Sequence, residues 1–307
     1  MTEEKNQSKE KKSGTFCSGY IAIIGRANVG KSTLLNQILG EKVAIVSPKP
    51  QTTRNRITGI RTTEAAQIIF IDTPGIHQGH SLMNRRMMDT ALQTLDEVDG
   101  VLWLLDAHDK IKLEEERIAE TLRGVETPVL ILLNKIDLIS KGKLLPLMER
   151  CAALLPGKEI VPVSALKGDG LDLVLNIVEH WLPEGPRYFT SGEYTDQSER
   201  FLASEIVREK VFLLTREEIP YGVAVTIDEF AEKEEKNLIV IAATIHTERD
   251  SHKGILIGKR GTMLKEIGRQ AREELEALLG CRIFLELFVR VDPNWTQNPR
   301  LLIEMGL

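Results

Sequence analysis

The segment Gly25–Ser32, GRANVGKS, has the residue types and the spacing of a phosphate-binding loop. It fits the pattern G-x-x-x-x-G-K-[ST], follows the apolar run YIAIIG and precedes a segment with helical spacing. Backbone N–H groups of such a loop bind phosphate oxygens at a helix N-terminus. Lys31 can neutralise the β- and γ-phosphates, and Ser32 can ligate Mg²⁺. The loop predicts a nucleoside triphosphate site made of Gly25, Arg26, Ala27, Asn28, Val29, Gly30, Lys31 and Ser32.

The segment NKID at residues 134–137 indicates which base this site accepts. It follows the apolar run PVLILL, downstream of the phosphate loop. The carboxylate of Asp137 can accept hydrogen bonds from both N1–H and N2–H of guanine, a donor pair that adenine lacks. Asn134 can contact the base and tether the phosphate loop, while Lys135 can lie along the ring, with Ile136 beside them. The segment therefore predicts GTP and GDP as ligands.

A shorter motif, VSA at residues 163–165, would close the guanine pocket. The backbone N–H groups of Ser164 and Ala165 would face the base there. Ser164 could equally be the N-cap of the following helix, so the motif carries weight only together with NKID.

Two segments between the phosphate loop and NKID are candidates for sensing the third phosphate. In DTPG, at residues 72–75, Asp72 would hold Mg²⁺ through water and the amide of Gly75 would contact the γ-phosphate, with Thr73, Pro74 and Ile76 nearby. In PQTTR, at residues 50–54, a threonine would coordinate Mg²⁺ only in the triphosphate state, as in a switch. We favour Thr53 for this role, with Thr52 as the alternative. The expected Mg²⁺ ligands are Ser32, Thr53 and Asp72, and the residues expected to act in hydrolysis are Lys31, Thr53 and Gly75.

These segments have the order and spacing of Ras-like GTPases, with two departures. Ile76 stands where Ras-type enzymes place a glutamine that orients the attacking water, so intrinsic hydrolysis should be slow. His77 is adjacent, but we interpret it as a solvated loop residue. Asn28 resembles the asparagine that helps to hold K⁺ in GTPases of the translation-factor class with a GxxNxGKS loop. We therefore hypothesise a K⁺ ion beside the phosphates in addition to Mg²⁺.

Length and composition predict two soluble domains. The chain has 307 residues, a net charge of −5 and three cysteines without ligand spacing, so a structural zinc site is not expected. Alternating strand-like and helical segments predict an α/β domain with a mostly parallel sheet over residues 18–183, after a disordered tail at residues 1–17. A polar linker at residues 184–198 leads to residues 199–307, where the order α-β-β-α-α-β with a C-terminal tail predicts a separate α+β domain.

A second glycine-lysine loop, GILIGKRG at residues 254–261, does not fit a nucleotide site. Only three residues separate Gly254 from Gly258, whereas a phosphate-binding loop has four, and Arg260 stands where the Mg²⁺-ligating hydroxyl belongs. The four residues GKRG instead match the GxxG loop of a KH domain, which lets the backbone of single-stranded RNA approach closely. The expected RNA-binding residues of this loop are Gly258, Lys259, Arg260 and Gly261.

Basic residues continue along the helix after this loop. Lys265, Arg269 and Arg272 recur at helical spacing, and residues 252–272 contain only one acidic residue. Because the chain is acidic overall, nucleic-acid binding requires such a local basic patch. A solvated helix face is the ordinary explanation of such spacing, and the α-β-β-α-α-β order is what favours RNA.

A GTPase domain joined to a C-terminal KH domain of this order closely resembles the bacterial Era family of GTPases, with a type II KH domain. The similarity extends through LPEGPRYF, ERFLASEIVREKVF and EEIPYGVAV to GILIGKRG. The resemblance implies binding of the 3′ end of 16S ribosomal RNA and a role in assembly of the small (30S) ribosomal subunit. It also implies peripheral association with the cytoplasmic membrane in some members. We expect a cytoplasmic monomer.

These observations together favour a GTP-hydrolysing molecular switch that binds single-stranded RNA. The alternative is an RNA-binding assembly chaperone in which GTP is mainly a structural ligand. Ile76 slightly favours the chaperone, whereas Lys31, Ser32, Asp72 and Asp137 favour the switch. An RNA-modifying catalyst would need a nucleophile or metal cluster, and the sequence shows no pattern for one.

Overall fold

The computed structural model describes residues 15–76 and 81–307, so His77 lies outside the described residues. The N-terminal domain contains a six-stranded sheet whose strands pair in parallel, except for one antiparallel edge strand. This confirms the predicted mostly parallel sheet. In spatial order the strands are β2 (Ile57–Thr62), β3 (Ala66–Asp72), β1 (Cys17–Gly25), β4 (Gly100–Asp106), β5 (Val129–Asn134) and β6 (Ile160–Pro162).

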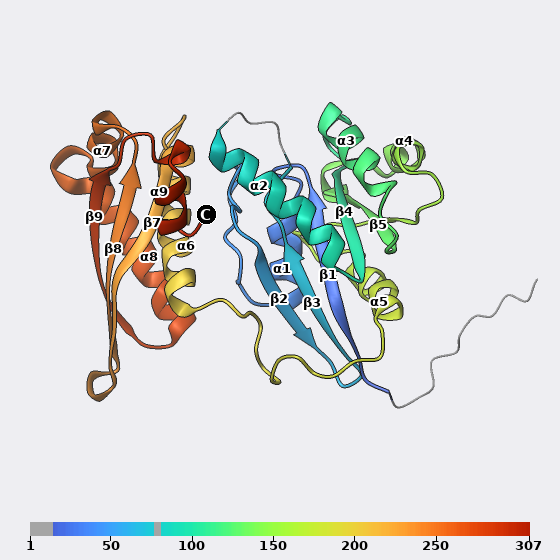
Figure 1. Cartoon of the computed structure of the whole chain (residues 1–307), viewed down its shortest axis with the longest axis horizontal. Helices are drawn as coiled ribbons and strands as arrows, with labels where there is room; N and C mark the ends of the chain where they lie inside the picture. The colour runs from blue at the N-terminus through green and yellow to red at the C-terminus, as the bar shows by residue number, and fades with distance from the viewer. Residues whose placement is uncertain (1–14, 77–80) are drawn as a thin grey trace, which may run out of the picture.

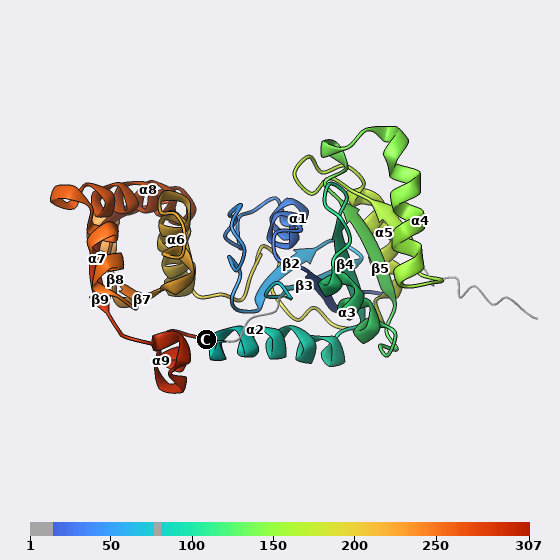
Figure 2. The same cartoon turned by 90° about the horizontal axis from the view of Figure 1, so that it is seen from above.

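Two helical layers cover this sheet. Along β1, alternate residues point to opposite faces: Ile21 and Ile23 pack in one apolar cluster, and Ala22 and Ile24 in the other. Figure 2 shows α1 and α2 on opposite faces. The helices of the domain are α1 (Lys31–Leu39), α2 (Leu82–Gln93), α3 (Leu113–Leu122), α4 (Leu144–Leu154) and α5 (Leu171–Trp181).

Two details at the edges of this domain differ from the sequence prediction. Cys17, assigned to the N-terminal tail, is the first residue of β1 and pairs with Ala66 of β3. Its side chain is buried in an apolar cluster of the domain. The sequence prediction did not include strand β2, because ITGIRT is short and partly polar. This strand pairs antiparallel with β3 at the edge of the sheet. The linker runs along that edge: the amide of Ile60 donates to the carbonyl of Tyr194, and the hydroxyl of Thr195 donates to the carbonyl of Thr58.

The C-terminal domain has the predicted order α-β-β-α-α-β. Its three-stranded sheet pairs β7 with β8 antiparallel and β8 with β9 parallel, and three helices pack their apolar residues on it (Figure 1). The elements are α6 (Glu199–Leu214), β7 (Val223–Lys233), β8 (Leu238–Thr247), α7 (Asp250–Ile257), α8 (Thr262–Leu279) and β9 (Arg282–Val291).

The residues after β9 form a structured contact between the two domains, where the sequence predicted only a tail. They include helix α9 (Pro299–Glu304). Leu302 of this helix and the preceding Trp295 are fully buried against Met83 and Met87 of α2. In Figures 1 and 2 the C-terminus accordingly lies beside the start of α2. No helix within the described residues combines the length and apolar character that crossing a membrane requires.

Candidate nucleotide site and nucleic-acid interface

The phosphate-binding loop lies between the end of β1 and the start of α1. Gly30 has φ +103°, and a Cβ there would lie 2.3 Å from the side-chain nitrogen of Asn134, so this position requires glycine. Gly30 caps α1 without a side-chain hydrogen bond, so the first N–H groups of the helix can bind an anion. Lys31 is buried, and its ammonium donates to the carbonyls of Gly25 and Arg26 at 3.2 and 3.1 Å.

Three oxygens converge at the first turn of α1. The hydroxyl of Ser32 lies 2.5 Å from Asp72 Oδ2 and 2.7 Å from Thr53 Oγ1, and the hydroxyl of Thr53 lies 3.4 Å from Asp72 Oδ2. The other carboxylate oxygen, Asp72 Oδ1, is buried without a hydrogen-bond partner among the described residues. Hard oxygen ligands with one uncompensated carboxylate oxygen fit Mg²⁺.

The charges of this cluster are strongly affected by burial. Burial raises the pKa of Asp72 to about 6, against the lowering effects of Lys31 and of hydrogen bonds from Ser32 and Thr53. Burial likewise lowers the pKa of Lys31 to about 8, and the negative charge of Asp72 partly offsets this. A bound phosphate and cation would favour the charged form of both groups, so the site is suited to ionic ligands.

The two threonines of PQTTR lie in different surroundings. Thr53 joins the oxygen cluster described above, whereas the hydroxyl of Thr52 donates to the carbonyl of Lys49 at 2.8 Å. This geometry favours Thr53 over Thr52 as the cation ligand. Residues 41–56, which connect α1 to β2, are called the switch loop below. With the phosphate-binding loop they enclose a cleft of about 420 Å³, large enough for a small polar ligand.

Residues after β3 pack closely on the phosphate-binding loop. A Cβ at Gly75 would lie 2.7 Å from the Cα of Ala27, so only glycine allows this approach. The amide of Ile76 donates to the carbonyl of Gly25, and its side chain packs on an apolar cluster. The hydroxyl of Thr73 donates to the carbonyl of Ile23, so its side chain points into the domain. The apolar side chain of Ile76 offers no hydrogen bond to an attacking water.

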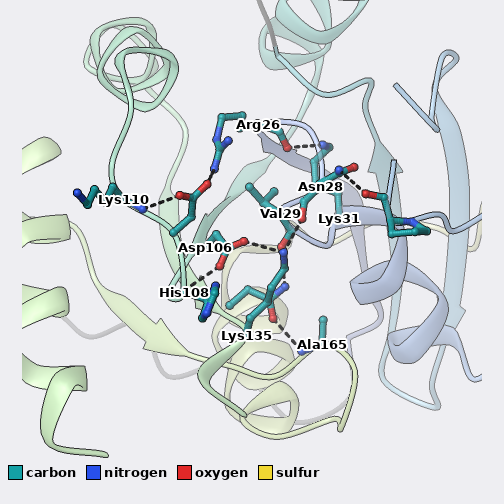
Figure 3. A network of polar contacts seen from close by, with 12 residues as sticks. Arg26, Asn28, Val29, Lys31, Asp106, His108, Lys110, Lys135 and Ala165 are labelled. Carbon is teal, nitrogen blue, oxygen red and sulfur yellow. Dashed lines mark hydrogen bonds and ion pairs between the residues drawn. The ribbon is translucent and has the colours of Figure 1, made fainter. Parts of the chain in front are cut away.

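The NKID segment lies next to the phosphate-binding loop, at the carboxyl end of β5. The side chain of Asn134 donates to the carbonyl of Val29 and accepts from the amide of Ala165, so it ties three segments together. Lys135 contacts the carboxylate of Asp106 at 2.6 Å, and Figure 3 shows these two side chains meeting beside the phosphate-binding loop. The same ammonium donates to the carbonyl of Asn28.

The carboxylate of Asp137 is oriented by a residue whose side-chain role the sequence did not reveal. The buried hydroxyl of Ser164 donates to Asp137 Oδ1 at 2.7 Å. The sequence prediction gave Ser164 only a backbone role or a capping role, and Ala165 only a backbone role. The hydroxyl of Ser164 holds the carboxylate of Asp137 in place, and the remaining acceptor positions of the carboxylate stay available for a base. Ile136, between Lys135 and Asp137, packs on the apolar cluster behind the segment.

Two side chains of the phosphate-binding loop have partners other than phosphate positions. The guanidinium of Arg26 pairs with Glu115 at 2.8 Å and Asp109 at 2.7 Å, so it points away from the cleft, as Figure 3 shows. Arg26 can therefore contribute to the site only through its backbone. The amide nitrogen of Asn28 donates to the carbonyl of Pro48 in the switch loop. Its oxygen can serve as a ligand for a cation, since a side-chain amide provides both a donor and an acceptor.

The second glycine-lysine loop connects α7 to α8, as predicted. Gly258, Arg260 and Gly261 have positive φ angles of 72°, 55° and 79°. A Cβ at Gly258 would clash with Met263 at 2.7 Å, whereas a Cβ at Gly261 would meet no atom within 4 Å. Packing therefore requires glycine at Gly258. At Gly261 the space is open, so the sugar-phosphate backbone of an RNA strand can approach the protein backbone there.

The basic stripe on α8 is weaker than the sequence count suggested. Arg269 pairs with both Glu266 and Glu273, and Arg272 pairs with Glu276. Glu273 and Glu276 lie beyond residues 252–272, the segment that contains only one acidic residue. Among the described residues Lys253, Lys259, Arg260 and Lys265 form no ion pair. The uncompensated positive charge therefore lies on α7, at the loop and on the first turn of α8.

Comparison with known proteins identifies the two domains that carry these candidate sites. The family described as 50S ribosome-binding GTPase matches residues 20–135, and the KH domain family matches residues 218–296. GTPase Era of Geobacter metallireducens is 54% identical over 294 residues, which cover 95% of this chain and 98% of the relative. GTPase Era of Syntrophus aciditrophicus is 55% identical over 291 residues, 95% of each chain.

Solved structures show the same two-domain fold. A point variant of Aquifex aeolicus Era bound to GDP·AlF₄⁻ superposes with a TM-score of 0.92 at 43% identity, covering 95% of this chain and 99% of that one. A structure of Era in complex with MgGDPNP and nucleotides 1506–1542 of 16S ribosomal RNA superposes with a TM-score of 0.91, at the same identity and coverage. Both domains of the described fold are thus shared with these GTPases. The chain belongs to the GTPase Era family and is a GTPase with a C-terminal KH domain.

Proposed function

We propose that the protein is a GTP-driven switch that binds the 3′ end of 16S ribosomal RNA through its KH domain and assists assembly of the small ribosomal subunit. The RNA complex of the related Era supports the choice of RNA. The observation that carries the switch is that one loop contacts both the nucleotide site and the KH domain. Thr53 of the switch loop joins the oxygen cluster that would hold Mg²⁺, while its neighbours contact α6 and the start of β7 in the KH domain.

In this proposal the nucleotide lies in the cleft between the phosphate-binding loop and the switch loop. Asp137, held by Ser164, selects guanine, and the buried ammonium of Lys31 faces the β- and γ-phosphates. Ser32, Thr53 and Asp72 would hold Mg²⁺, which when bound neutralises phosphate charge. The oxygen of Asn28 would contact K⁺. Hydrolysis is slow, since Ile76 cannot orient the attacking water.

On the RNA side, Gly258, Lys259, Arg260 and Gly261 contact the RNA backbone. Lys265 adds charge on the first turn of α8, while Arg269 and Arg272 contribute less because acids on the same helix neutralise them. We place the protein in the cytoplasm as a monomer. Peripheral contact with the cytoplasmic membrane belongs to the proposal only by family resemblance.

The test is the affinity for a short single-stranded RNA with the sequence of the 16S 3′ end, at fixed salt because phosphate contacts are salt-sensitive. Protein loaded with a non-hydrolysable GTP analogue should bind this RNA more tightly than protein loaded with GDP. Equal affinities would refute the direct switch. Multiple-turnover hydrolysis separates the chaperone alternative: stimulation by RNA or by small subunits is expected for a switch, and none for a chaperone.

A further inference from the structure

An arginine of the KH domain reaches into the nucleotide domain and holds the switch loop. Arg208, on α6, donates from Nη2 to the carbonyl of Thr52 at 2.5 Å, and the residue is only 3% exposed. Both oxygens of Glu205, one turn earlier on the helix, bind the same guanidinium at 2.7 and 2.6 Å. The guanidinium also lies 5.2 Å from the ring centroid of Phe212. Its position is therefore fixed from within the KH domain.

The carbonyl that Arg208 binds belongs to the peptide bond between Thr52 and Thr53. On the other side of that peptide, the hydroxyl of Thr53 lies 2.7 Å from the hydroxyl of Ser32. A planar peptide transmits the orientation of its carbonyl to the next residue. The guanidinium and the oxygen cluster thus act on adjacent groups of one short segment.

Neighbouring contacts strengthen this arrangement on both sides. The ammonium of Lys49 donates to the carbonyls of Phe212 and Thr215 at the end of α6. The guanidinium of Arg54 donates to the carbonyls of Val223 and Pro220, at 2.6 and 3.1 Å. Lys49 and Arg54 thus anchor the switch loop on either side of Thr52 and Thr53, whereas Arg208 binds the peptide group between these two threonines.

We propose that Arg208 is a positioning residue of the nucleotide site, contributed by the KH domain, which holds Thr53 in the orientation that the triphosphate state requires. This rests on the proposed function, because it assigns Thr53 to the Mg²⁺ of bound GTP. Thr53 contacts the cation only when the third phosphate is present, so Arg208 favours GTP over GDP. By linkage, the bound triphosphate also favours the docked position of α6 by the same factor.

The test uses three variants of the full-length protein. Arg208→Ala removes the contact, Arg208→Lys keeps the charge but lacks the two-pronged geometry that binds Glu205, and Arg200→Ala is the matched control. Arg200 lies on the same helix, is exposed and donates to the carbonyl of Ile227 within its own domain. For each, the affinities for a non-hydrolysable GTP analogue and for GDP are measured over a Mg²⁺ titration.

Arg208→Ala should weaken binding of the GTP analogue about tenfold, the value of one charged hydrogen bond, and leave GDP binding within about twofold. More Mg²⁺ should be needed for half-maximal binding of the analogue, and no more for GDP. Arg208→Lys should fall between, and Arg200→Ala should match the wild type. Equal loss for both nucleotides would show a merely structural role and overturn the proposal, as would unchanged binding of the analogue.

RNA affinity distinguishes failure of this inference from failure of the proposed function. If the wild type binds RNA equally in both nucleotide states but Arg208→Ala loses its preference for the GTP analogue, the proposed switch falls and the role of Arg208 stands. If the wild type shows the switch and Arg208→Ala keeps the wild-type preference for the analogue, the role of Arg208 falls alone.

Discussion

The hydroxyl of Ser164 and the carboxylate of Asp137 form a hydrogen bond of 2.7 Å between two segments far apart in the sequence. The bond fixes the carboxylate at the end of β5, where a guanine base would present its N1–H and N2–H groups. In the proposed site, nucleotide selectivity would therefore depend on this pair of residues rather than on Asp137 alone.

Asp137→Asn should change the base that the protein accepts. An amide cannot accept both hydrogen bonds from guanine, but its NH₂ group can donate to the oxygen that xanthine carries instead. We expect GDP affinity to fall at least about a hundredfold and xanthosine diphosphate to bind better than to the wild type. Competition with a fluorescent nucleotide measures both. Retained GDP affinity would show that Asp137 does not contact the base.

Gly261→Asp should abolish RNA binding and leave nucleotide affinity unchanged. A Cβ at Gly261 meets no atom within 4 Å, and aspartate tolerates its positive φ better than most residues, so the fold should persist. The added carboxylate would repel the RNA phosphates. The matched control is Gly280→Asp, because Gly280 also has a positive φ and open surroundings but lies at the far end of α8. Loss of GTP binding in Gly261→Asp would contradict the separation of the two sites.

Glu209→Gln should destabilise the protein in a pH-dependent way. Glu209 is buried at the domain contact and binds Lys42, Lys210 and the amide of Val46. Burial alone would raise the pKa of Glu209, but these hydrogen bonds outweigh it and hold the pKa below its ordinary value of 4.5. A depressed carboxyl pKa contributes stability that is present above the ordinary value and lost as the pH falls through the folded pKa.

We therefore expect Glu209→Gln to lower the free energy of unfolding by about 2 kcal/mol near neutral pH, because charged hydrogen bonds are lost. The difference from the wild type should shrink once the pH falls below 4.5. Thermal unfolding of both proteins across this range measures it. Glu229→Gln, on the exposed surface of β7, serves as the control and should show little difference at any pH. A difference that does not vary with pH would contradict the assignment.

GTP hydrolysis should be faster in K⁺ than in Na⁺ at equal ionic strength. The amide nitrogen of Asn28 is bound to Pro48 of the switch loop, which leaves the amide oxygen to contact a cation beside the phosphates. Such a cation would stabilise the negative charge that develops on the phosphates during hydrolysis. Asn28→Ala should reduce hydrolysis in K⁺ to the rate in Na⁺. Equal rates in both salts for the wild type would refute the K⁺ site.

Local sequence motifs were sufficient for the parts of the fold and site that depend on short segments. Glycine spacing predicted the phosphate-binding loop and the GKRG loop, because each needs particular backbone angles within a few residues. Contacts between distant segments were not predictable in this way. In the sequence, Arg208 is not distinguished from any other charged residue of a helix. Its contact with Thr52 forms only when the two domains pack together. The ion pairs of Arg269 and Arg272 likewise depend on which neighbours share a helix face.

The linker that runs along β2 also protects the sheet edge. Unpaired N–H and C=O groups on an edge strand are templates for pairing with another chain, and native proteins cover them. Here the amide of Ile60 and the carbonyl of Thr58 are occupied by Tyr194 and Thr195. A nucleotide domain cut at residue 183 would lose that cover and expose β2. The linker therefore also protects the nucleotide domain from aggregation. A truncated nucleotide domain that retains residues 184–198 should be more soluble than one cut at residue 183.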